Sequence, residues 1–170
     1  FGGDNKLDPS FCRSHDIRQT VVYIDDTTLV LGQNGWLENI YNKLKATLVP
    51  GERTTLVELS PSTGQSTERW TGCWPAYTVA ETAKLASEHY IFSTSPLANL
   101  KMQQGFFARD LGIAVANIEK AHARSASQVV IDPNAPPHQS LIRALASDGA
   151  RYAHTQETIR AILYSNLAEN

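Results

Sequence analysis

The most constraining feature of this sequence is an unbroken apolar run that ends in two adjacent acids. Residues 20–31 read TVVYIDDTTLVL, so the apolar residues 21–24 lead directly into Asp25 and Asp26. A β-branched and aromatic run of this kind is typical of a strand that is buried on both faces of a parallel sheet. Because carboxylates are not expected inside such a strand, we place Asp25 and Asp26 at its carboxyl end. In open α/β sheets this is the end at which ligands bind.

Further helices and strands follow from the spacing of apolar residues and from turn signals. Apolar residues recur every fourth position over 36–48, which predicts an amphipathic helix with Asn34 as its N-cap. Strands are expected at 54–59 and 68–74, joined through a glycine-containing turn as an antiparallel hairpin at a sheet edge. Three more helices are predicted, at 80–90, 97–121 and 139–147. Gly105 and Gly112 predict local bends in the second of these, because glycine disfavours a helix interior.

The last segment is compatible with two kinds of secondary structure. Ile159, Ile162 and Leu163 have helical spacing, and Thr155 could cap a helix there. The run 159–164 also has the composition of a strand, and periodicity over so few residues does not decide between them. Both alternatives stay open on this evidence.

Length and charge limit the class of protein. The 170 residues suffice for a single domain with a core, which we place at 20–170 after an irregular N-terminal arm at 1–19. A formal net charge of −2 offers no electrostatic basis for binding nucleic acid or an anionic membrane surface. No apolar stretch reaches the roughly 18 residues of a membrane span. The chain begins with Phe1, so we expect that any targeting segment lies upstream.

The two cysteines, Cys12 and Cys73, fit no zinc or redox-motif spacing. They could be two buried free thiols or a single disulfide. We predict the disulfide, because the arm that contains Cys12 has few apolar residues with which to hold itself against the domain. In the chain-entropy model, closing a loop of this length stabilises the fold by roughly 4 kcal/mol.

Several of these segments together resemble von Willebrand factor A-like domains, in particular bacterial members. The first strand ends in Asp25-Asp-Thr-Thr28, and the hairpin ends in Gly72-Cys-Trp-Pro75. The segment 139–145 (QSLIRAL) resembles the helix after their threonine-bearing loop, and 162–167 (ILYSNL) resembles their fourth strand. The resemblance implies a three-layer Rossmann-like α/β fold, with a mostly parallel sheet and helices on both faces. It also implies that 159–164 is a strand and that later strands of the fold are absent from this segment.

The resemblance also implies a metal-ion-dependent adhesion site, in which oxygen ligands hold Mg²⁺. Asp25 and Thr27 match the first two ligand positions, whereas Leu29 stands at the third. The loop threonine falls near Ser140, and Asn166 replaces the aspartate that ends the fourth strand. Because a neutral amide replaces a carboxylate, we expect a degenerate site. No cofactor is expected, with Mg²⁺ at Asp25 and Thr27 as the one candidate.

A phosphatase active site is the alternative interpretation of the same acids. The segment IDDTTL echoes haloacid dehalogenase-type phosphatases, in which two aspartates separated by one residue act as nucleophile and general acid. Here Asp25 and Asp26 are adjacent, and neighbouring strand residues point to opposite faces. The residue two after Asp25 is Thr27, which is no general acid at neutral pH. A Mg²⁺-dependent hydrolase that uses Asp25 and Asp26 is therefore the alternative function.

The sequence thus predicts a non-enzymatic protein-interaction or scaffold module whose partner is a protein of unknown identity. We expect the partner to bind at the carboxyl ends of the central strands, around Asp25, Asp26, Thr27, Ser140 and Asn166. The five histidines are scattered without zinc spacing, and the three tryptophans are expected to pack in the core or at a sheet edge. Because the relatives often carry an N-terminal membrane anchor, the resemblance favours an extracytoplasmic location.

Overall fold

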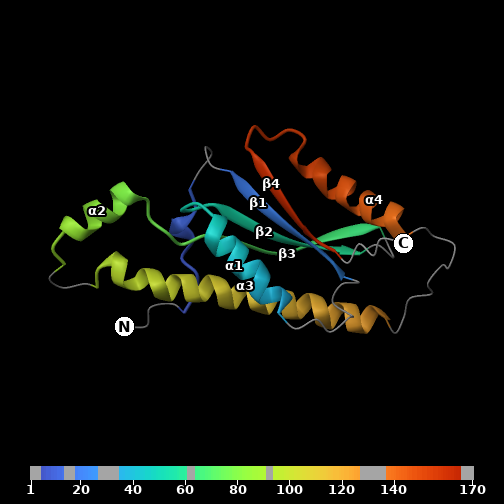
Figure 1. Cartoon of the computed structure of the whole chain (residues 1–170), viewed down its shortest axis with the longest axis horizontal. Helices are drawn as coiled ribbons and strands as arrows, with labels where there is room; N and C mark the ends of the chain where they lie inside the picture. The colour runs from blue at the N-terminus through green and yellow to red at the C-terminus, as the bar shows by residue number, and fades with distance from the viewer. Residues whose placement is uncertain are drawn as a thin grey trace.

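The computed structural model describes residues 5–13, 18–26, 35–60, 64–90, 94–126 and 137–165, with the backbone alone at 123–126, 137–140 and 142. In chain order the elements are η1 (Pro9–Phe11), β1 (Gln19–Asp25), α1 (Trp36–Thr47), β2 (Arg53–Ser60), β3 (Gln65–Cys73), α2 (Val79–Ser87), α3 (Pro96–Ala126), α4 (Pro137–Gly149), η3 (Ala150–Tyr152) and β4 (Ile159–Tyr164). The fold is α/β, with a mixed but mostly parallel sheet (Figure 1).

The sheet has four strands in the order β3-β2-β1-β4. β1 is parallel to both β2 and β4, whereas β2 and β3 form the antiparallel hairpin that the turn at 60–64 predicts. Gly64 in that turn has a φ of 67°, a conformation that glycine adopts without steric cost. β1 therefore lies inside the sheet, and β3 is an edge strand of the described sheet.

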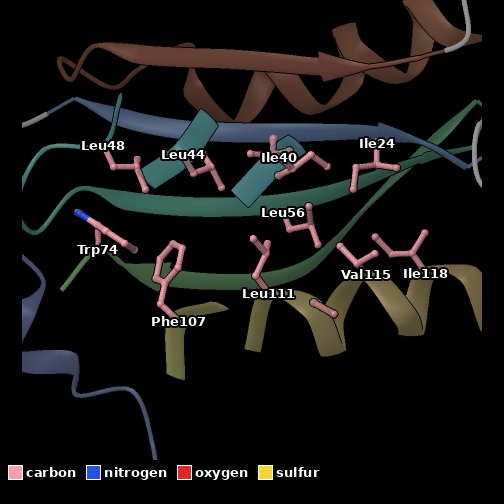
Figure 2. Close-up of a cluster of buried hydrophobic side chains, with 12 residues drawn as sticks. Ile24, Ile40, Leu44, Leu48, Leu56, Trp74, Phe107, Leu111, Val115 and Ile118 are labelled. Atoms are coloured by element: carbon pink, nitrogen blue, oxygen red, sulfur yellow. The ribbon is translucent and has the colours of Figure 1, made fainter. Parts of the chain in front are cut away.

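Helices pack against both faces of β1. Val22 and Ile24 belong to a cluster with α1 and α3, which includes Ile40, Leu111 and Ile118 (Figure 2). Successive side chains of a strand point to opposite faces, so residues next to these face the other way. Val21 and Tyr23 accordingly pack with Val57, Leu59, Leu141 and Ala144 in a second cluster beneath α4.

A polar contact fixes α4 to the centre of β1. The Tyr23 hydroxyl donates a hydrogen bond to Oδ2 of Asp148, at 2.5 Å, near the carboxyl end of α4. Arg151 pairs with the same carboxylate at 2.7 Å. Burial is the largest cause that raises the pKa of Tyr23, and the neighbouring Asp148 adds to it. The phenol therefore stays protonated and acts as a donor at neutral pH.

Helix boundaries differ from the sequence prediction in three places. α1 has Gly35 at its N-cap position, with a φ of 110°, and Asn34 lies outside the described residues. α2 ends at Ser87 rather than near residue 90. α3 ends at Ala126 rather than near residue 121, and it is one helix of 31 residues that continues through Gly105 and Gly112. Its apolar stripe, with Phe107 and Leu111 fully buried, packs along the sheet and outweighs the low helix propensity of the two glycines.

The terminal segment is a strand, as the resemblance implied. Ile159–Tyr164 pairs in parallel with Gln19–Ile24 of β1. Ile159 packs against the cluster under α4, whereas Ile162 and Tyr164 pack against the cluster under α1 and α3. The side of β1 that does not pair with β2 offers backbone hydrogen bonds to another strand. This tertiary pairing favours a strand over a helix at 159–164, a choice that periodicity alone does not make.

The N-terminal arm is held to the domain by the predicted disulfide. Cys12 and Cys73 are bonded, which joins the arm to the end of β3 across 61 residues. The tryptophans pack as expected, since Trp74 is buried and both Trp70 and Trp74 contact the ring of Phe107.

No helix in the described part of the chain combines the length and apolar character needed to cross a bilayer.

Phe107 is the side chain by which α3 contacts both tryptophans, at ring-centroid distances of 5.1 Å from Trp70 and 5.0 Å from Trp74. We predict that Phe107→Ala lowers the free energy of unfolding by about 3–5 kcal/mol, because it leaves a cavity in a packed core. The matched control is Ile113→Ala on the exposed side of the same helix, which should change it by less than about 1 kcal/mol. Denaturant unfolding of the oxidised protein measures both, and equal effects would contradict this packing.

Candidate functional site

Polar residues gather where β1, β2 and β4 end. Asp25 and Asp26 close β1, Ser60 closes β2, and Ser165 follows β4. Because β1, β2 and β4 are parallel, all four residues lie at the same end of the sheet, where these strands reach their carboxyl ends. β2, the next strand in sequence, lies on one side of β1, and β4 lies on the other side. α1 and α4 cover opposite faces of the sheet. This reversal of strand order is the position at which open α/β sheets bind ligands.

Asp25 connects β1 to β4 at this point. Its carboxylate accepts a hydrogen bond from the Ser165 hydroxyl, at 2.8 Å between Oγ and Oδ2. The residue is only 5% exposed, so the bond lies largely out of water, where a charge-assisted hydrogen bond is strong. Asp25 thus holds the ends of the two strands together.

Asp26 faces the α3 side of the sheet instead. Its Oδ2 lies 3.6 Å from Nδ1 of His122, which has no hydrogen-bond partner among the described residues. Burial is the largest cause that raises the pKa of Asp26, and the nearby Glu58 and Asp25 carboxylates raise it further. A hydrogen bond from Ser60 and the charge of His122 oppose this without cancelling it.

The raised pKa means that ionised Asp26 costs stability at neutral pH. The folded state holds a proton more tightly than the unfolded chain does, so stability falls as pH rises through the raised pKa. Acids kept in such surroundings are more common at functional sites than elsewhere. Glu58 is also buried, and Arg69 donates a hydrogen bond to its Oε2 from Nε at 2.6 Å.

A second buried acid, Glu52, lies at the opposite end of the strands and behaves in the opposite way. Arg18 donates to both of its oxygens, at 2.8 and 3.0 Å, and Thr20 donates to Oε1 at 2.6 Å. Burial alone would raise the pKa of Glu52, but these bonds and one from the Val49 amide lower it below its usual value. Glu52 is therefore a stabilising acid, and Asp26 is a destabilising one.

The structure describes only part of the predicted site. Asp25 and Asp26 lie at the carboxyl end of β1, as expected. Ser140 lies in the first turn of α4, and its side chain is not described. Thr27 and Asn166 lie outside the described residues.

Sequence reasoning missed Ser60, His122 and Ser165. Ser60 and Ser165 carry a signal that could have identified them, because each is a polar residue that ends or directly follows an apolar strand. His122 carries no such signal. Only the packing of α3 against the sheet brings it to Asp26 across 96 residues of sequence (122 − 26).

Of the ligand positions for Mg²⁺ that the resemblance implies, the structure describes the side chain of Asp25 alone. Within the described ranges, no group of three or more His, Cys, Asp or Glu side chains is placed to hold a metal ion. Asp25 accepts the Ser165 hydroxyl on one oxygen, and Asp26 faces a histidine.

Comparison with known proteins gives no match: no family model, no curated protein and no solved structure corresponds to this chain.

The two buried acids predict opposite mutational effects. Asp26→Asn should raise the free energy of unfolding at pH 7 by about 0.5–2 kcal/mol, because it removes a charge that burial disfavours. The gain should shrink as pH falls through the raised pKa of Asp26, because the wild-type carboxyl then takes up its proton. Denaturant unfolding from pH 4 to 8 measures both effects.

Glu52→Gln is the matched variant at the other edge. It should lower the free energy of unfolding at pH 7 by about 3 kcal/mol, because the neutral amide loses the charge, keeps only one acceptor oxygen and turns an NH₂ group toward the donors of Arg18 or Thr20. The contribution of Glu52 is present at neutral pH and is lost as pH falls through its lowered pKa. Destabilisation by both substitutions would contradict the assignment of Asp26.

Proposed function

We propose that this chain is a von Willebrand A-like domain that serves as a non-enzymatic protein-interaction or scaffold module. Its binding surface lies at the carboxyl ends of β1 and β4, around Asp25, Asp26 and Ser165. In this proposal the domain has the three-layer Rossmann-like architecture of that family, with a degenerate adhesion site that lacks part of the metal-ligand set.

The arrangement of strands supports the family assignment. The segments that carry the resemblance include a strand before Asp25, a hairpin before Pro75 and a last strand at 159–164. Each is a feature of this sheet. Helices on both of its faces agree with a layered fold.

The observation that carries the functional proposal is the divergence of the two acids. Asp25 contacts Ser165 at the end of β4, whereas Asp26 contacts Ser60 at the end of β2 and faces His122 on α3. A hydrolase of the alternative type needs both carboxylates on one substrate. Two acids with different neighbours instead position the ends of three strands and present one rigid edge, which suits binding.

The disulfide supports an extracytoplasmic location. Disulfides form and persist in oxidising compartments and are rare in the cytosol of most organisms. The Cys12–Cys73 bond therefore fits a domain that faces the periplasm or the cell exterior.

Site-specific photo-crosslinking tests the binding edge. A benzophenone amino acid at Gln65, an exposed residue paired with Ser60 at the carboxyl edge, should cross-link a protein partner in cells that express the domain. The same group at Lys45, in the last turn of α1, should not. With the purified partner, Asp25→Ala should weaken binding about tenfold or more, because it releases the end of β4 from β1 at the binding surface. Lys45→Ala is the matched control for that measurement and should leave affinity unchanged.

An enzyme assay separates the proposal from its alternative. The domain with Mg²⁺ and a generic phosphomonoester should give no turnover above background. Turnover that Asp25→Asn abolishes would overturn the binding proposal. Cross-linking from Lys45 alone would move the binding surface to the other edge.

A further inference from the structure

The N-terminal arm, residues 5–13, crosses several elements that are distant in sequence. Besides the disulfide to β3, its polar contacts reach α3, since the Asp8 amide donates to Oε1 of Gln103 at 2.8 Å. The Arg13 amide reaches the O of Gly51, at 3.4 Å, in the turn before β2. Gly51 has a φ of 75°, and an added Cβ would lie 2.4 Å from Cγ of Arg13. The arm is therefore closely seated on the domain.

The arm also holds α2. None of the nine residues of α2, all of which the structure describes, is buried. Nη2 of Arg13 donates to both carboxylate oxygens of Glu81 in the first turn of this helix. The Phe11 ring contacts Tyr77 just before the helix, with centroids 5.4 Å apart. Figure 1 shows α2 beyond the end of the sheet, next to the arm. α2 also contacts α3, and with so little burial the helix depends on both sets of contacts for its position.

The polar contacts of the arm are individually weak, and Leu7 adds a partly buried apolar contact with the core cluster. Arg13 and Glu81 are each 36% exposed, and exposed ion pairs contribute little against the entropy of ordering a segment. The hydrogen bonds to Gln103 and from Arg109 to the Asn5 carbonyl are exposed as well. The disulfide is different, because it keeps the arm near the domain at a high effective concentration.

We propose that the Cys12–Cys73 bond is a redox latch that controls the arm and α2 together. In the oxidised protein the bond keeps the arm seated, and Arg13 in turn positions α2. When a dithiol reductant breaks the bond, the arm leaves, α2 loses its contacts with the arm, and the sheet with α1, α3 and α4 stays folded.

The chemistry is ordinary thiol–disulfide exchange. A thiolate of the reductant attacks one sulfur, the S–S bond breaks, and a mixed disulfide forms while the other cysteine leaves as a thiolate. The second thiol of the reductant then releases the first cysteine. The protein gains two electrons and two protons, and the reductant becomes a cyclic disulfide. Cys12 is the accessible point of attack, because Cys73 is only 3% exposed and Cys12 is partly exposed.

Opening the latch uncovers the face of β3 around Gly72. Leu7 of the arm lies against Gly72, with its Cδ2 3.0 Å from the position of an added Cβ there. Arm residues and β3 residues together line a groove of about 600 Å³ that also includes Trp70. Among the described residues β3 pairs only with β2, so it is an edge strand with or without the arm. Release of the arm thus exposes a surface that the oxidised state covers.

Hydrogen–deuterium exchange of the whole chain, with and without a dithiol reductant, tests the latch. In the reduced protein, amides of the arm and of Val79–Ser87 should exchange about tenfold faster or more, as expected for a segment that opens locally. Amides of Gln19–Asp25 in β1 should keep their protection. The double variant Cys12→Ser/Cys73→Ser should give the reduced pattern without reductant.

Single substitutions separate the two parts of the latch. In the oxidised protein, Arg13→Gln should speed exchange in α2 and leave the arm around Cys12 protected. Glu68→Gln removes a comparable exposed ion pair, to Arg151, on the α4 side and should leave α2 unchanged. Unchanged exchange of the arm after reduction would overturn the proposal, because noncovalent contacts would then suffice. Loss of protection in β1 on reduction, or failure of the double variant to fold, would overturn it as well, because the bond would then support the whole domain.

Discussion

The two-sided burial of β1 is the constraint on which the rest of this structure depends. Val21 and Tyr23 need a helical layer on one face, and Val22 and Ile24 need one on the other. A strand with this requirement must lie inside the sheet, with a partner on each side. The parallel pairing with β2 and β4 then brings three strand ends to the same edge, together with the polar residues that close them. The candidate site is thus a consequence of how the core is built.

The two ends of the strands use buried acids in different ways. At the amino end, Glu52 is fully buried and surrounded by donors, so its charge is satisfied and it fastens Arg18 and Thr20 to the turn before β2. At the carboxyl end, Asp26 has fewer donors and two acidic neighbours, and its charge is disfavoured. Natural proteins commonly give up stability at the site that performs their function. This contrast is the physical reason for assigning function to the carboxyl edge.

Sequence alone predicted the parts of the fold that depend on strong local patterns. The strand before Asp25, the helix after Gly35 and the edge hairpin each follow from apolar spacing or turn residues, and all three were confirmed. The final strand was ambiguous because Ile159 and Ile162 suit a helix as well as a strand until β1 supplies a partner. Around the site, the sequence identified the two acids but neither Ser165 nor His122. Those contacts depend on strand pairing and on the position of α3, which are properties of the assembled fold rather than of any local segment.

Asp26 follows β1 and is buried beneath α3, in surroundings that differ from those of Asp25. Carbon-13 NMR of the side-chain carboxyl groups, recorded as a function of pH, measures this most directly. We predict that the pKa of the Asp26 carboxyl lies above the ordinary aspartate pKa of about 3.9. The His122 ring signals should respond to the titration of Asp26. An Asp26 pKa at or below the ordinary value would contradict this account, since that result would place this carboxylate in water or among donors.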